Sequence, residues 1–116
     1  GSSFIGAGIW HPEPKVLQTL RQFIFENPAS WEAAVYAPKV QATFTLLDEE
    51  KLLRTPRGFP SDFAFIDDLK LKNIVMWRAL DESEMVSPDL VSRVAEDLRL
   101  LSPFMDYLCA ALDLEF

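Results

Sequence analysis

The chain has 116 residues, of which 49% are hydrophobic and 25% charged, so it has the composition of a folded domain and not of a disordered chain. No apolar run approaches the ~18 residues that a membrane-spanning helix needs, and the single cysteine excludes an intrachain disulfide, which favours an intracellular location. The net charge of −7 arises within residues 81–116. The acidic side chains of this segment form either a solvated face or a surface for a basic partner, and they disfavour nucleic acid binding.

The first predicted strand, residues 3–10, is an apolar run that leads directly into a helix start. A strand this apolar needs neighbours on both sides, so we expect further polypeptide to attach there. Apolar residues then recur every three or four positions, which predicts a helix over 13–26. Asn27 and the proline after it predict the cap and first turn of a second helix over 28–36.

The middle of the chain alternates between strand and turn signals. Residues 40–47 are rich in β-branched and aromatic side chains, which predicts a second strand. Residues 54–60 contain two prolines and a glycine and are predicted to form a loop. Ser61 is the predicted cap of a helix over 62–70, and residues 73–80 form the third predicted strand.

Residues 81–85 are predicted to connect this strand to a final helix over 88–112, with Ser87 as cap and Pro88 in its first turn. Pro103 falls inside the helical pattern and is expected to kink or divide the helix. Beyond Pro103 the predicted helix is apolar on almost all sides, so we expect it to be buried in the core of the domain in preference to forming a coiled coil.

Four sequence blocks occur in one order, SFIGAGIWHPEP, LLRTPRGF, IDDLKLKN and SPFMDYLCAAL, between Ser3 and Leu112. Together they resemble the bacterial and fungal family called domain of unknown function 2461. The resemblance implies that members are longer than this chain, which corresponds to their C-terminal part. The family loop usually continues into an Asp-His-Pro-like step, whereas this chain has Asp62-Phe63-Ala64 and lacks the histidine. The family has no established activity.

Few residues are suited to catalysis. His11 is the only histidine and Cys109 the only cysteine, and a buried cysteine is expected to be inert, so no catalytic residue is predicted. Two such residues cannot form a zinc site. The acidic clusters Asp67-Asp68 and Asp48-Glu49-Glu50 lack a calcium-loop pattern and are read as solvated acids, so no metal or cofactor is predicted. Gly6-Ala7-Gly8 lacks the third glycine of a phosphate-binding turn and indicates a strand that passes close to another backbone.

The best ligand-binding candidate is the basic loop, which we define as Lys51, Arg54 and Arg57 together with Lys70. Arginines on a proline-held loop can bind a carboxylate or phosphate through two hydrogen bonds. The alternative is that these cations pair with nearby carboxylates and only fix the loop. The sequence favours this structural role but leaves both open.

These observations predict an α+β fold, with a small mixed or antiparallel sheet of about three strands packed against four helices. Residues 1–116 would be a single domain or the C-terminal portion of a larger one. The first functional hypothesis is a non-catalytic interaction or scaffold module, which completes its fold with a missing N-terminal part, another chain or a second copy. Its expected interface residues are Phe4, Ile5, Ile9 and Trp10. The second hypothesis is a phosphate-, nucleotide- or carboxylate-binding domain, enzymatic in the complete protein, that uses the Arg54–Phe59 loop.

Overall fold

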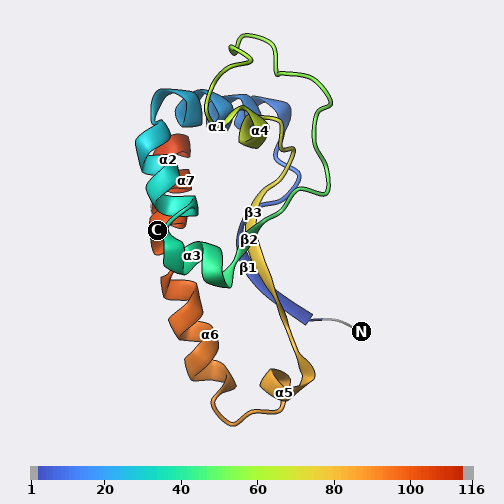
Figure 1. Ribbon diagram of the computed structural model, residues 1–116, viewed down its shortest axis with the longest axis vertical. Coiled ribbons are helices and arrows are strands. Elements are labelled where there is room, and N and C mark those ends of the chain that lie inside the picture. Colours follow the sequence, from blue (N-terminus) through green and yellow to red (C-terminus); the bar gives the residue numbers. More distant parts are fainter. Residues whose placement is uncertain (1–2, 114–116) are drawn as a thin grey trace.

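The computed structural model describes residues 3–113 and contains an antiparallel sheet of three strands. Strands β1 (Ser3–Ile9) and β2 (Thr45–Leu46) flank the central strand β3 (Ile74–Leu80), so the strand order is β1–β3–β2 (Figure 1). Both pairings are antiparallel. The predicted α+β fold with about three strands is confirmed, and so are the first and third strands.

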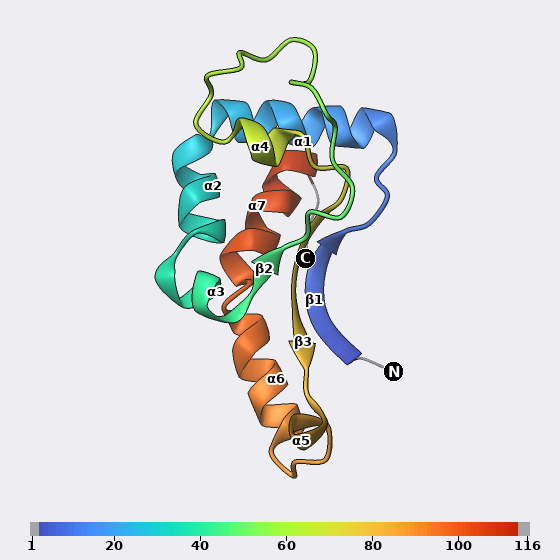
Figure 2. The ribbon, with the colours of Figure 1, turned by 45° about the vertical axis from the view of Figure 1, so that its right-hand side comes forward.

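The described residues form seven helices where the sequence predicted four. They are α1 (Pro14–Glu26), α2 (Pro28–Val35), α3 (Pro38–Thr43), α4 (Ile66–Leu69), α5 (Glu82–Met85), α6 (Leu90–Arg99) and α7 (Ser102–Leu112). Helices α2, α3, α6 and α7 lie on one side of the strands, and α1 crosses one end of this layer (Figures 1 and 2). The molecule is elongated, 49 × 28 × 26 Å.

The core lies between this helical layer and one face of the sheet. Trp31 of α2 is fully buried, and its ring packs 5.4 Å from Tyr107 and 6.2 Å from Phe104 of α7, measured between centroids. Met76 of the central strand is also fully buried in the same cluster. Burial of large apolar side chains is the main favourable contribution to the stability of such a layer.

Prolines occupy the first turns of α1, α2, α3 and α7, where no backbone N–H is needed. The predicted starts of α1 and α2 are therefore confirmed. Asn27 does take the cap position of α2, but it does not cap that helix with its side chain. Its Nδ2 instead donates to the carbonyl oxygen of Phe23 at 3.0 Å and so stabilises the end of α1.

The predicted strand over 40–47 is wrong for most of its length. Helix α3 takes its first half, and only two residues join the sheet as β2. Val40 is 4% exposed and packs into the core, while the side chain of Gln41 donates to the last turn of α2 at 2.7 Å. These contacts outweigh the β-propensity of the valine, threonine and phenylalanine residues in this segment.

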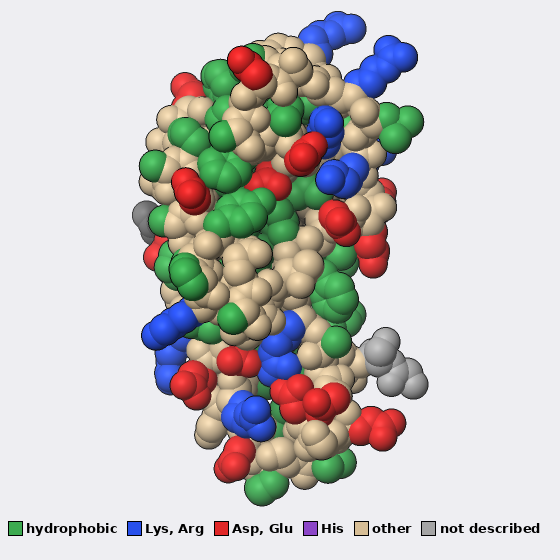
Figure 3. Space-filling model, viewed as in Figure 1, with side chains coloured by type: hydrophobic (Ala, Val, Ile, Leu, Met, Phe, Trp, Pro, Cys, Tyr) green, Lys and Arg blue, Asp and Glu red, His purple; other side chains and the backbone are tan. Residues whose placement is uncertain are grey.

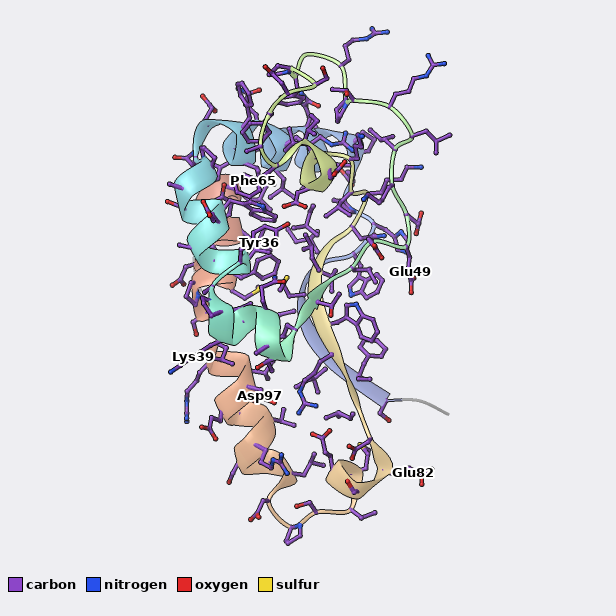
Figure 4. The ribbon with its side chains drawn as sticks, in the orientation of Figure 1. Tyr36, Lys39, Glu49, Phe65, Glu82 and Asp97 are labelled. Carbon is purple, nitrogen blue, oxygen red and sulfur yellow. The ribbon has the colours of Figure 1, made fainter. Side chains whose placement is uncertain are left out.

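The predicted helix over 62–70 is reduced to the single turn of α4. Aromatic contacts fix the residues before it in turns: Phe63 packs edge-on against Phe25 of α1, with centroids 5.1 Å apart. Phe65 stacks on Tyr36 at 5.6 Å with an interplanar angle of 18° (Figure 4). Packing of these two phenylalanine rings against distant aromatic side chains outweighs the local helix propensity of the segment.

A buried carboxylate holds α4 against α2. Asp68 is 9% exposed, and its Oδ2 accepts hydrogen bonds from Nε1 of Trp31 at 2.8 Å and from the hydroxyl of Tyr36 at 2.7 Å. Burial, the hydrogen bond to Asp68 and the negative charge of that carboxylate raise the pKa of Tyr36 well above its usual range.

The long helix predicted over 88–112 is divided, as Pro103 indicated, into α6 and α7. The predicted start is wrong, because α6 begins at Leu90, two residues beyond Pro88. The hydroxyl of Ser87 accepts a hydrogen bond from the backbone N–H of Asp89 at 3.2 Å, so it stabilises the turn that precedes the helix.

The segment 81–85, predicted as a connection, forms α5, and the side chains of Asp81 and Glu84 make a capping box at its start. Arg78 of β3 joins this helix to α6. Its guanidinium donates to Glu84 at 2.8 and 3.1 Å and to Asp97 at 2.9 Å. Acidic and basic side chains accordingly alternate over this end of the molecule, around α5 and α6 (Figure 3).

Candidate functional site

The sheet is covered by helices on one face only, and the other face exposes aromatic side chains. Residues opposite one another in a ladder project to the same side, so Phe4, Gly6 and Gly8 share this outer face with Ala79, Trp77 and Val75, of which Val75 is buried. The rings of Phe4 and Trp77 meet edge to face at 6.3 Å. We call this surface, with Trp10 at its end, the outer face.

The four predicted interface residues divide between the two faces of β1. Phe4 is 57% exposed and Trp10 is 48% exposed. Ile5 and Ile9 are half-buried and pack against the helical core. Hydrophobic side chains therefore reach the surface beside the strands (Figure 3).

Strand β1 has an open edge. It pairs with β3 on one side, and among residues 3–113 no strand pairs with its other side, contrary to the expectation of two neighbours. A groove of about 480 Å³ follows this edge and is lined by Gly6 and Ala7 and by Leu98, Leu101 and Met105 of the helical layer. Unpaired backbone groups beside an apolar groove favour the addition of another strand.

The glycines of β1 allow close approach of the two main strands, as their sequence context indicated. A Cβ on Gly6 would lie 2.5 Å from the carbonyl oxygen of Met76, and one on Gly8 would overlap the carbonyl oxygen of Ile74. Gly8 also has a φ of +147°, which a residue with a side chain rarely adopts. Both glycines thus serve the sheet.

The basic loop is spread along one end of the molecule. Lys51, Arg54 and Arg57 are exposed, and Lys51 forms an isolated bridge with Leu71. Lys70 is half-buried, and its Nζ lies 3.4 Å from Oδ1 of Asp67. The loop therefore stays a predicted anion site, with one of its four cations already paired.

A cleft of about 460 Å³ lies between the start of α1 and the segments on either side of the Lys51–Leu71 bridge. We call it the His11 cleft; its lining includes His11, Leu17, Arg21, Glu50, Leu52 and Lys72. The backbone of residue 72 donates to the carbonyl of residue 50 at 3.1 Å, and that of residue 52 to the carbonyl of residue 70 at 2.8 Å. These two bonds join the segments that carry Glu50, Leu52 and Lys72.

His11 is held at the rim of this cleft in an unusual backbone conformation. Its φ is +45°, and its backbone N–H donates to Oδ1 of Asn73 at 2.7 Å. Asn73 is 2% exposed, and its Nδ2 donates to Glu50 at 3.4 Å. Nδ1 of the imidazole lies 3.9 Å from the same Glu50 oxygen. A left-handed residue that is not glycine is often found at functional sites.

Arg21 lies in the cleft without an acidic partner. Its Nε donates to the carbonyl oxygen of Leu69 at 2.6 Å and its Nη2 to that of Leu71 at 3.3 Å. No carboxylate of the described residues comes within 4 Å of either Arg21 or Lys72. Burial lowers the pKa of Arg21, because the charged form loses water without gaining a counter-ion.

Sequence reasoning missed this constellation. It weighed His11 only as a catalytic residue and gave no role to Arg21, Glu50 or Asn73. The only available signal was Lys72, which lies two residues beyond the basic loop's Lys70.

The remaining candidates give no second constellation. Cys109 is half-buried on α7, so it is less buried than the sequence predicted. His11 contacts Asn73 and Glu50. Within residues 3–113, no three His, Cys, Asp or Glu side chains gather as a metal site. No helix of this part of the chain is both long and apolar enough to cross a membrane.

Comparison with protein families gives one match. The family described as "Conserved hypothetical protein (DUF2461)" matches residues 1–107 of the chain. The chain belongs to this family. No curated protein and no solved structure matches it. The DUF2461 description names no activity, and the features of this DUF2461 chain that bear on function are the outer face, the β1 edge and the His11 cleft.

Proposed function

We propose that this DUF2461 chain is a non-catalytic interaction module, which assembles with a second copy of itself through the open edge of β1. The observation that carries the proposal is the one-sided sheet. Its edge strand has seven residues, of which alternate ones direct their backbone groups away from β3, and its outer face bears Phe4 and Trp10 about half exposed. An apolar edge strand of this length is a template for pairing with another strand.

The side chains of β1 are complementary to a second β1 in antiparallel register. Pairing about a two-fold axis at Gly6 places Phe4 opposite the partner's Gly8 on the outer face, and aromatic rings commonly cover glycines in this way. On the helix-facing side, Ala7 lies opposite the partner's Ile5. The larger side chain would then enter the groove that Ala7 lines with Leu98 and Met105.

The charge distribution also permits this pairing. Residues 3–10 contain no ionisable side chain, so the two β1 strands themselves bring no like charges into contact, although the chain carries a net charge of −7. Among the described residues, Asp106 is the one charged residue in the lining of the groove beside Gly6 and Ala7. The resulting sheet would have six strands and a continuous outer face. A symmetric dimer is the commonest assembly of identical chains.

The test is sedimentation equilibrium of the 116-residue chain over a concentration series, compared with Phe4→Lys. Phe4 is more than half exposed, so the substitution should leave the fold intact, while a lysine on the edge strand opposes pairing. Leu53→Lys is the matched control, because Leu53 is 98% exposed and lies outside β1. We expect a dimer that Phe4→Lys weakens by at least about tenfold and that Leu53→Lys leaves unchanged.

Hydrogen exchange of the β1 amides supplies a second readout. Their protection should rise with protein concentration in the wild type and not in Phe4→Lys. A strictly monomeric wild type at every concentration, or equal effects of the two lysine substitutions, would refute self-pairing through β1.

A further inference from the structure

We infer that the His11 cleft binds a small organic carboxylate with an apolar body, whose carboxylate group is held by Arg21 and Lys72. This site uses none of the residues in the proposed β1 interface, so it stands or falls independently of self-assembly. The site also differs from the basic loop, because the two arginines of that loop are not among the residues that line the His11 cleft.

Arg21 has the donors that a carboxylate needs. A guanidinium carries five N–H donors, and two of them are used by the carbonyl oxygens of Leu69 and Leu71. Three remain, on Nη1 and Nη2, and this end of the guanidinium can bind two oxygens side by side. The backbone carbonyls fix the orientation of the side chain, which lowers the entropic cost of ligand binding.

The cleft has an excess of positive charge. Arg21 and Lys72 both line it, and neither has a carboxylate within 4 Å among residues 3–113. Glu50 is the only acidic residue of the lining, and it lies on the His11 side. Arg21 is half-buried, whereas Lys72 is exposed. Because a half-buried cation without a counter-ion gains more from an anionic ligand than an exposed one does, Arg21 is the main anchor of the carboxylate and Lys72 adds to it.

The other walls define the class of anion. Leu17 and Leu52 line the cleft together with two prolines, so part of any ligand would contact apolar surface. Glu50 at the rim disfavours a dianion such as phosphate. A monoanionic carboxylate joined to a ring or a short aliphatic chain satisfies both conditions.

The experiment is a titration of the ¹⁵N-labelled chain with sodium benzoate, followed by ¹H–¹⁵N NMR at constant ionic strength with sodium chloride as the reference. We expect saturable shifts of the backbone amides of His11, Leu52 and Lys72 and of the Nε–H of Arg21. Inorganic phosphate, titrated in the same way, should shift these signals less at equal concentration.

Variants separate the cleft from the basic loop. Lys72→Met removes a charge whose Nζ has no partner in the described residues, so it should preserve the fold and weaken benzoate binding about tenfold. Arg21→Gln should abolish saturation. The double variant Arg54→Gln/Arg57→Gln is the matched control and should bind as the wild type does.

Several results would overturn the inference. One is the absence of saturable shifts with benzoate, and another is an unchanged affinity in Lys72→Met. Loss of binding in the Arg54→Gln/Arg57→Gln variant would assign the anion site to the basic loop. Equal or tighter binding of phosphate at the same residues would refute the carboxylate class.

Discussion

A single carboxylate oxygen of Asp68 accepts hydrogen bonds from Trp31, in the middle of α2, and from Tyr36, directly after its last residue. The neighbouring Asp67 has a side chain that is 76% exposed and lies near Lys70. The two aspartates therefore have the same chemistry and very different surroundings. Because exposed ion pairs contribute little to stability and buried acceptors contribute much, their effects can be separated.

Asp68→Ala should lower the free energy of unfolding by about 2–4 kcal/mol, because it leaves the buried N–H of Trp31 and the hydroxyl of Tyr36 without their acceptor. Asp67→Ala should change it by less than about 0.5 kcal/mol. Urea denaturation of the two variants measures the difference. Similar losses in both would contradict the role assigned to Asp68.

The residues of the His11 cleft show why a sequence cannot reveal such a site. The basic loop is recognisable because its arginines are three positions apart, whereas Arg21 and Lys72 lie on segments that meet only in the folded chain. Nothing in the sequence marks Asn73, which orients His11, because it is uncharged and belongs to no periodic pattern. Its importance follows from its burial at 2% exposure.

At the scale of elements, Arg78 joins three of them, because a guanidinium on β3 bonds to carboxylates on α5 and α6. The side chains of both Arg78 and Glu84 are only 16% exposed. Asp97, the partner of Arg78 on α6, is labelled in Figure 4. The hydrogen bond from Arg78 lowers the pKa of Glu84, and the same bond raises the pKa of Arg78.

Arg78→Met should therefore lower the melting temperature at pH 7 by several degrees. The folded-state pKa of Glu84 lies below its unfolded value of about 4.3, so this contribution is complete above that pH and is lost as the pH falls through the folded-state pKa. The difference between wild type and Arg78→Met should shrink below about pH 4.

Calorimetry across pH 3–7 tests this expectation, and Arg99→Met supplies the control, since Arg99 lies in the last turn of α6 and forms no ion pair within residues 3–113. A difference between wild type and Arg78→Met that does not depend on pH would argue against the ion pairs as its cause.

The elements that the sequence predicted well are long and periodic: β1, α1, β3 and the divided final helix. The short helices α3, α4 and α5 have four to six residues, too few for stability from propensity alone. Helices α3 and α4 form because of contacts with distant residues, such as Asp68 with Trp31, which leave no trace in the local sequence pattern. Helix α5 does have a local signal, the capping box of Asp81 and Glu84, and Arg78 of the neighbouring strand adds an ion pair to it.

At the scale of the whole molecule, the two tyrosines of the chain report on the helical layer. Burial raises the pKa of Tyr107, whose hydroxyl donates to the carbonyl oxygen of Asn27 at 3.0 Å, and the pKa of Tyr36 is raised as well. One ring joins α7 to the end of α1, and the other joins α2 to α4.

The folded protein should consequently show little phenolate absorbance at 295 nm near pH 10, where the denatured chain is half-titrated. Because both folded-state pKa values exceed the unfolded value, the stability linked to these groups is complete below pH ~10 and is lost as the pH rises further. Titration in guanidinium provides the reference. Half-titration of the native chain at pH 10 would contradict this packing.

The separation of the paired strands β1 and β3 along the chain has a consequence during synthesis. Ile9 pairs with Ile74 and Ser3 with Leu80, so the partners in the β1·β3 ladder are at least 65 residues apart. At translation rates of roughly 5–20 residues per second, β1 leaves the ribosome ~3–13 s before its partner. For that time its uncharged, apolar residues have no native neighbour. The newly made chain should therefore depend on chaperones that bind extended apolar segments.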